Sequence, residues 1–184
     1  MDKIKLKGEY RIIVTYTTMF HQHQATIQQS NLITDKGLEF LIQKWSQDNT
    51  QTNVGEILKH KISKIIVGYN PTDPTPDDNI STITRNNDQN NPFPVNLKHE
   101  GNQLIMVNNN VSGKTINQTT EIGVIGEKVI ENYNTYTNEV DNVEVYETVL
   151  ISRSTHPIIT VPPTSIISLE YKYTLTSVQS EDEC

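Results

Sequence analysis

The amino-acid sequence predicts a mainly β protein, an antiparallel β-sandwich with one packed amphipathic helix and long loops. One segment, at 34–47, has the residue spacing of an amphipathic helix. About seven short segments show the alternation of apolar and polar residues that is typical of strands. The stretches between them are rich in Asn, Thr, Pro and Asp. With 184 residues, the chain is expected to form a single domain, 1–184, with a long polar loop region at about 69–110.

The composition favours a lean core and argues against several function classes. Hydrophobic residues make up 34% of the chain, below the roughly 45–50% of an ordinary globular protein. The net charge is -7 and no block of Lys and Arg is interleaved with aromatic residues, so we expect no specific nucleic-acid partner. The single cysteine, Cys184, excludes a disulfide within the chain. No apolar run reaches the roughly 18–20 residues of a membrane span, so we expect no membrane partner.

The N-terminal third contains a strand region followed by the helix. Residues 4–20 keep an apolar residue at every second position, which predicts a strand or a bent pair of strands with Gly8 as a bulge. Residues 21–31 are polar and ambiguous. Thr34 is a natural N-cap for the helix, and Ile33 and Leu38 have the spacing of a hydrophobic staple. The residues expected on the buried stripe are Leu38, Leu41, Ile42 and Trp45.

The segment after the helix predicts a short helical turn, a strand and a long loop. The turn is expected at 54–59, and the strand at 62–67 ends at Gly68. Residues 69–91 contain three prolines and four aspartates, and the prolines with Asp73, Asp77 and Asp78 exclude regular structure there. Because long structureless loops are usually functional or disordered, this loop and the Asn-rich stretch at 86–110 are expected to be ordered by adjacent subunits.

The C-terminal half predicts further strands. They are expected at 103–107, 122–125 and 143–151, followed by a proline-bearing connection at 156–164. The last strand has the clearest pattern, because Leu169, Tyr171, Tyr173 and Leu175 share one face and polar residues occupy the other. This alternation is typical of a half-buried antiparallel strand.

Ser112-Gly113-Lys114-Thr115 and the pair His21 and His23 are partial motifs. The first resembles the end of a phosphate-binding loop, but Asn108 stands where that motif needs a glycine, so a β-hairpin turn is the favoured interpretation. The two histidines can share one side of a strand, but a structural zinc site typically has four ligands and no third follows.

The remaining polar clusters also fall short of a site. Asp73, Asp77, Asp78 and Asn79 carry oxygen ligands suited to calcium, but their spacing differs from an EF-hand loop. Glu144 and Glu147 are expected on opposite faces of a strand. We therefore assign no catalytic, cofactor-binding or metal residues and expect a protein that is not an enzyme.

Several short motifs resemble the attachment domains of phage tail-collar fibre and baseplate-type virion proteins. They occur in the family's order from about 32 to 175. The matching segments are Leu32-Ile33-Thr34-Asp35 with Gly37-Leu38, Ile62-x-x-Ile65-x-Val67-Gly68, Glu121-Ile122-Gly123-Val124-Ile125, Leu150-Ile151-Ser152-Arg153, and Leu169-x-Tyr171-x-Tyr173. The last two segments resemble the closing hairpin of that family.

The resemblance implies a bacteriophage virion structural protein. Family fibres carry a shaft and a receptor-binding tip after this domain, whereas this chain ends at Cys184. We therefore expect a tail, collar or neck ring component that joins portal-proximal tail parts or anchors fibres. Its expected partners are further copies of itself in a symmetric ring and neighbouring tail, portal or fibre proteins. Its expected location is the virion, with the host cytoplasm as the place of assembly.

The alternative is a tail-fibre or carbohydrate-binding β-sandwich module. Such a module uses exposed aromatic side chains, for which Tyr69, Tyr133 and Tyr136 are the candidates.

Overall fold

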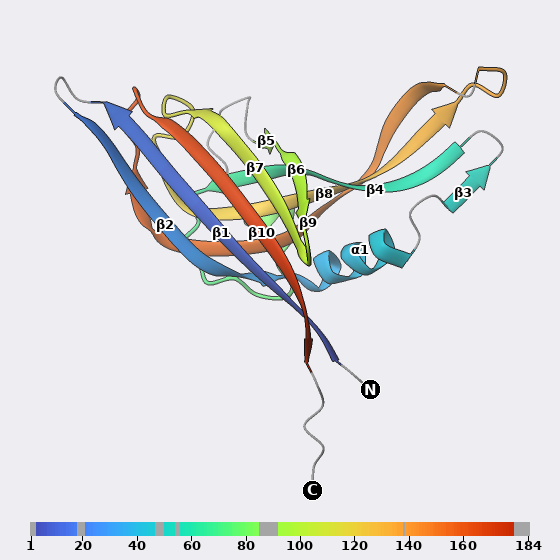
Figure 1. Cartoon of the computed structure of the whole chain (residues 1–184), viewed down its shortest axis with the longest axis horizontal. Coiled ribbons are helices and arrows are strands. Elements are labelled where there is room, and N and C mark those ends of the chain that lie inside the picture. Colours follow the sequence, from blue (N-terminus) through green and yellow to red (C-terminus); the bar gives the residue numbers. More distant parts are fainter. Residues whose placement is uncertain are drawn as a thin grey trace, which may run out of the picture.

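The computed structural model describes residues 3–17, 21–46, 50–53, 56–84, 92–137 and 139–178. Within these ranges the chain forms one α-helix, one short 3-10 turn and the strands of a 10-stranded sheet (Figure 1). The elements are β1 Lys3–Thr17, β2 Gln22–Ile33, α1 Asp35–Ser46, β3 Thr50–Asn53, β4 Glu56–Gly68, η1 Ile80–Thr82, β5 Phe93–Pro94, β6 Asn96–Glu100, β7 Gln103–Ser112, β8 Gln118–Tyr133, β9 Val140–Thr160 and β10 Ile166–Val178.

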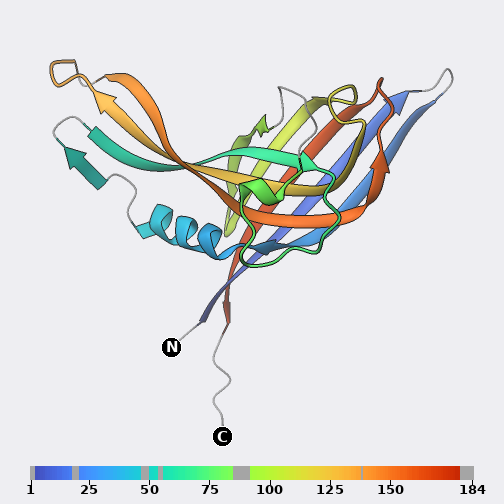
Figure 2. The same cartoon turned by 180° about the vertical axis from the view of Figure 1, so that it is seen from behind.

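The strands form one antiparallel sheet that curls until its ends nearly meet. The strand order is β3-β4-β8-β9-β2-β1-β10-β7-β6, and β5 pairs with β4. Because β5 runs directly into β6, which pairs with β7, the chain bridges the two ends of the sheet. The mainly β, antiparallel architecture with one packed helix is confirmed. The sheet is nearly closed and barrel-like (Figures 1 and 2), so the two separate layers of a sandwich are not confirmed.

The first two strands form a long hairpin. β1 pairs with β2 from Gly8 to Thr17 and with β10 from Lys3 to Thr15, without a shift in register. The predicted bulge at Gly8 is therefore wrong. The ambiguous polar stretch at 21–31 belongs to β2, whose residues 22–30 are nearly all exposed. A strand that is exposed to solvent on both faces has no alternation of apolar and polar residues, and the sequence therefore did not reveal β2.

The predicted helical turn at 54–59 is also wrong for residues 56–59, which are the part of it that the structure describes. Residues 56–59 are the start of β4, and they pair with residues 129–132 of β8. The strand expected at 62–67 is confirmed as the second half of β4, which ends at Gly68.

The helix begins where the sequence predicts. The Thr34 side chain accepts a hydrogen bond from the Gly37 amide at 2.9 Å, which is the expected N-cap. The hydroxyl of Thr34 also donates to the Leu150 carbonyl at 2.5 Å, so the cap ties the helix to β9.

The helix buries a different face from the one predicted. Phe40 and Leu41 are 1% and 0% exposed, whereas Leu38 is 44% and Ile42 is 53% exposed. The side chain of Trp45 lies outside the described residues. The rotation follows from Gly37, because a Cβ atom there would stand 2.0 Å from the Ile151 carbonyl oxygen. This close approach turns the face that starts at Gly37, rather than the one that starts at Leu38, toward β9.

The hydrophobic core fills the inside of the barrel-like sheet. Its largest members are aromatic: Tyr10, Tyr171 and Tyr173 are at most 2% exposed. The hydroxyl of Tyr171 lies 3.2 Å and that of Tyr173 2.5 Å from the Ser152 hydroxyl, so these polar ends are paired inside the core. The predicted alternation of the last strand is confirmed at Leu169, Tyr171 and Tyr173.

Several predicted connections are strands or have different partners. Residues 93–110 are largely β5, β6 and β7, so the loop after β4 is shorter than 69–110. β9 extends through Thr160 and covers the first part of the connection expected at 156–164. β9 pairs with β8 and β2, whereas β10 pairs with β1 and β7, so the expected closing hairpin is not formed.

We expect Phe40→Ala to lower the free energy of unfolding by about 3–5 kcal/mol, because it empties a buried aromatic site between the helix and the sheet. Phe40 packs against β8 so closely that a Cβ atom on Gly126 would stand 2.5 Å from its ring. The exposed neighbour Ile42 is the matched control, and Ile42→Ala should change the free energy by less than about 0.5 kcal/mol. Urea denaturation measures both, and equal losses in the two variants would contradict this orientation of the helix.

Candidate functional site

A buried ion cluster holds the loop that follows β4. Arg153 on β9 is 0% exposed. Its Nε donates to Glu121 Oε2 at 2.8 Å, its Nη1 to Asp78 Oδ2 at 2.9 Å and its Nη2 to the Asn70 carbonyl at 3.1 Å. All three nitrogens of the guanidinium therefore have a partner. A buried charge is tolerated when it is paired and hydrogen-bonded in this way.

Glu121 joins the two ends of the described loop. Its Oε1 accepts hydrogen bonds from the Asn70 amide at 2.8 Å and from the Thr84 amide at 3.0 Å. One carboxylate on β8 thus fixes both the beginning and the end of the segment. Figure 2 shows the loop in front of β8 and β9.

Asp78 fixes the middle of the loop. It accepts hydrogen bonds from the amide of Thr75 at 3.0 Å and from the hydroxyl of Thr75 at 2.9 Å. Desolvation favours the neutral acid, but the hydrogen bonds from Thr75 and Arg153 outweigh it and lower the pKa of Asp78 below its ordinary value. The Pro76 carbonyl then accepts from the Asp35 amide at 2.9 Å, which links the loop to the start of α1.

The cluster is structural rather than reactive. Its acidic and basic groups are saturated by one another and by backbone groups. Residues 69–84 were expected to be ordered by adjacent subunits, but contacts within the chain hold them, and Ile83 packs with Ile66, Ile125 and Leu150 beneath the loop. The sequence offered a signal for this cluster: a lone arginine within an apolar strand is rarely buried unless it is paired.

The strongest candidate for an external function is a projecting arm. We define the arm as residues 56–61 of β4, 127–133 of β8 and 140–148 of β9, with β3 beside them. Figures 1 and 2 show these strands extending beyond the barrel-like part, with α1 on one side of them. The contact of Phe40 with His60 at 5.2 Å between ring centroids places the helix on the His60 face.

The opposite face of the arm carries an ion cluster. Lys59 and Lys61 each lie 2.6 Å from a carboxylate oxygen of Glu131, and the Tyr133 hydroxyl donates to Glu131 at 2.7 Å. Hydrogen bonds from Lys59, Lys61 and Tyr133 outweigh burial and lower the pKa of Glu131 to about 2. These contacts join β4 to β8 and stiffen the arm.

The outer strand of the arm is exposed on both faces. Every residue from 140 to 146 is exposed, and the apolar side chains Val143, Val145 and Tyr146 are 46%, 55% and 72% accessible. β8 is the only strand paired with this part of β9 among the described residues. The outer edge of these seven residues therefore presents unpaired backbone groups, which can hydrogen-bond to another strand.

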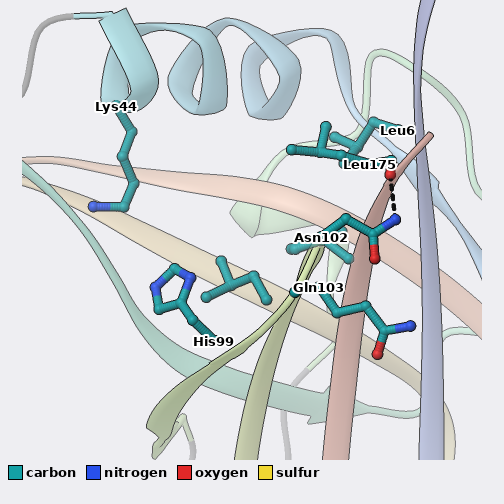
Figure 3. Close-up of a pocket in the computed structure, with 9 residues that line it drawn as sticks. Leu6, Lys44, His99, Asn102, Gln103 and Leu175 are labelled. Atoms are coloured by element: carbon teal, nitrogen blue, oxygen red, sulfur yellow. Dashed lines mark hydrogen bonds between the residues drawn. The ribbon is translucent and has the colours of Figure 1, made fainter. Parts of the chain in front are cut away.

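A cavity of about 280 Å³ lies between the end of α1 and the β6–β7 turn (Figure 3). Leu6, Leu104 and Tyr173 give it apolar walls, while Lys44 and His99 stand at its polar side. The Lys44 amine donates to the His60 carbonyl at 2.9 Å. Figure 3 shows Asn102 pointing to the Leu175 carbonyl, to which it donates at 2.6 Å. This amide is thus directed to the backbone, and the cavity presents a largely apolar surface.

The partial motifs noted in the sequence do not converge on one site. Residues 113–115 form a turn, but it joins β7 to β8, which do not pair, so it is not a hairpin turn. The rings of His21 and His23 are 6.4 Å apart, and His23 stacks on Tyr16 at 5.1 Å. Among the described residues, no group of three or more His, Cys, Asp or Glu side chains could hold a metal ion. No helix of the described part is long and apolar enough to cross a membrane.

The three candidate tyrosines do not form one platform. Tyr69 follows the end of β4 opposite Glu121, and Tyr133 lies about 12 residues, or roughly 40 Å, further along β8. Tyr133 is occupied by the ion cluster, whereas Tyr136, in the turn beyond it, is 98% exposed.

Comparison of the chain with family models, curated proteins and solved structures gives no match.

We expect Arg153→Met to lower the free energy of unfolding by about 3–5 kcal/mol, because it leaves Glu121 and Asp78 buried without their counter-charge. Lys64→Met is the control. It breaks the pair with Glu127 at 2.6 Å, but the Lys64 side chain is 37% exposed, so the loss should stay within about 1 kcal/mol. Denaturant titration measures both variants. If Arg153→Met loses no more free energy of unfolding than Lys64→Met, the Arg153 cluster does not stabilise the fold more than a surface ion pair does.

The Glu131 cluster predicts a loss of stability in acid. The folded pKa of about 2 lies below the ordinary value of 4.5, so the contribution is complete above pH 4.5 and disappears as the pH falls toward 2. We expect the parent to be more stable than Glu131→Gln by a constant amount above about pH 5, with the difference vanishing near pH 2.

The measurement is urea denaturation at a series of pH values. Asp73→Asn, at an exposed loop position, is the control and should follow the parent throughout. A difference between parent and Glu131→Gln that persists unchanged down to pH 2 would contradict the assignment.

Proposed function

We propose that the protein is a non-enzymatic structural subunit of a bacteriophage tail, collar or neck. In this proposal it self-associates in a symmetric ring, joins portal-proximal tail parts or anchors fibres, and resides in the virion after assembly in the host cytoplasm. The observation that supports an assembly role is the arm, with its outer strand exposed on both faces from residue 140 to 146.

Such a strand favours protein association. Monomeric proteins usually protect a long edge strand with charges, prolines, bulges or a covering element. The edge strand of the arm carries acidic residues and two register shifts against β8, but no other described strand covers it. Three valines and a tyrosine are exposed on it, and the ion cluster on β4 and β8 stiffens the strands behind it. A projecting, stiffened edge can add to a sheet of another molecule with little loss of conformational entropy.

The phage setting rests on the resemblance of the segments between 32 and 175. Two of these segments supply Glu121 and Arg153, which pair at 2.8 Å and fasten the loop after β4. The residues that carry the resemblance thus include a central contact of the fold. A subunit arranged around a tail axis closes a ring through head-to-tail contacts, which use two different surfaces of each copy.

A second candidate is a carbohydrate-binding or tail-fibre module. Tyr136, which is 98% exposed at the end of the arm, favours it, because exposed tyrosine rings can stack on ligands. Binding of the purified protein to host-surface glycans that is abolished in Tyr136→Ala would support this function over the ring.

The proposed function predicts that purified virions contain several copies of the protein for each tail. Quantitative mass spectrometry of gradient-purified particles, with a major tail protein as the internal standard, measures the ratio. The infected-cell lysate is the control for expression. Abundant protein in the lysate with none in particles would contradict the virion role.

A further inference from the structure

A second free strand edge lies at the start of β1. β10 pairs with residues 3–7 of β1 on one side. β2 covers the other side only from Gly8 onward, because it leaves β1 after Asn31 and pairs with β9 through Leu32 and Ile33. Residues 3–7 therefore present unpaired backbone groups along one side, within the described part of the chain.

An apolar groove accompanies this edge. The point where β2 leaves β1 opens a groove of about 390 Å³. Leu6, Ile33 and Leu38 line it, and Leu38 is the helix residue that the sequence placed in the core. Leu38 is 44% exposed, and a side chain from another molecule would cover it in an assembly.

The charges of the two free edges are complementary. Residues 140–148 of the arm contain three carboxylates and no basic residue, and one of the three, Glu147, pairs with Lys128 at 2.8 Å. Lys5 and Lys7 are exposed on the free edge of β1. Lys7 already pairs with Glu9 at 2.8 Å, whereas in the described structure neither Lys5 nor Glu144 has an ion-pair partner. Attraction between these edges would select one pairing among the free strands.

The patterns of the two edges also match. On β1, Leu6 stands between Lys5 and Lys7, and on β9, Glu144 stands between Val143 and Val145. Antiparallel pairing with Lys5 opposite Glu144 places Leu6 opposite Val143. A shift of two residues places Lys7 opposite Glu144 and Leu6 opposite Val145. Both registers therefore give one ion pair and one apolar pair, since directly opposite residues share a face.

We propose that the arm of one copy adds as a strand to the free edge of β1 in the next copy, with Val143 or Val145 inserted into the groove lined by Leu6, Ile33 and Leu38. This contact deepens the proposed ring function and rests on it. It joins two different surfaces of the same chain, so repeated contacts close a ring or continue as a filament.

Sedimentation velocity of the purified protein over a range of concentrations tests the contact. Cys184→Ser serves as the parent, so that no disulfide contributes. We expect the parent to associate and both Glu144→Lys and the double variant Lys5→Glu, Lys7→Glu to associate at least about tenfold more weakly. Association of the parent should also weaken as salt is raised, because the paired charges are at the surface.

Mixing the two charge-reversed variants gives the decisive result. In the mixture the reversed arm of one variant meets the reversed β1 edge of the other, and the two unchanged surfaces also meet, so every contact is again complementary. We expect the mixture to regain the parent's association. Asp73→Lys, a matched reversal on the exposed loop, should associate like the parent.

Disulfide cross-linking identifies which residues of the two copies meet in the contact. Leu6→Cys combined with Val143→Cys or with Val145→Cys, in the Cys184→Ser background, should give a ladder of disulfide-linked multimers on mild oxidation. Each single cysteine variant should give none beyond a dimer.

Three results would overturn the contact: a monomeric parent at every concentration, unchanged association in both charge variants, or a mixture of folded variants that stays dissociated. The composition of virions decides the proposed function separately. Several copies per particle with unaffected charge variants would retain that function and remove this contact. If the mixture regains association but the protein is absent from particles, the contact is retained and the proposed function is removed.

Discussion

The fold depends on one buried guanidinium. Arg153 reaches from β9 to Glu121 on the neighbouring strand and to Asp78 and the Asn70 carbonyl in the loop after β4. Bringing one cation and two carboxylates out of water is expensive, and the mutual contacts offset that cost only when all donors are used. Because both ends of the loop bind Glu121, a long polar segment becomes a fixed cover over β8 and β9. The cover also contacts the amide of Asp35 and so orients the helix.

Sequence reasoning found the helix and the better-patterned strands because local signals decided them. The Thr34 cap, the strand ending at Gly68 and the buried Leu169, Tyr171 and Tyr173 all follow from short-range spacing. The buried face of the helix was missed because a tertiary contact decided it. Leu38 and Phe40 both fit an apolar stripe that includes Leu41, and the close approach of Gly37 to the Ile151 carbonyl selects the second.

Two of the strands that the sequence missed are exposed on both faces. Residues 22–30 of β2 and 96–100 of β6 have almost no buried side chain, so burial gives them no alternating pattern. Backbone pairing with β1 and β7 defines them instead. The strand expected at 143–151 is confirmed within β9. The Arg153 cluster could have been predicted, since a lone arginine in an apolar strand signals a buried partner. The identity of Asp78 as that partner could not, because it depends on the path of the loop.

Exposure on both faces also explains why the arm needs its ion cluster. A strand without a buried face gains little from the hydrophobic effect, and isolated hairpins are marginal in water. The arm compensates with a third strand and with two lysines that converge on Glu131. Those contacts lie on β4 and β8 and leave the outer edge of β9 free. The acidic edge strand is thus held in place without being covered, and its register against β8 shifts twice within the arm. The basic edge of β1 is left open because β2 departs toward β9. Both free edges arise from how the nearly closed sheet exchanges its strand partners.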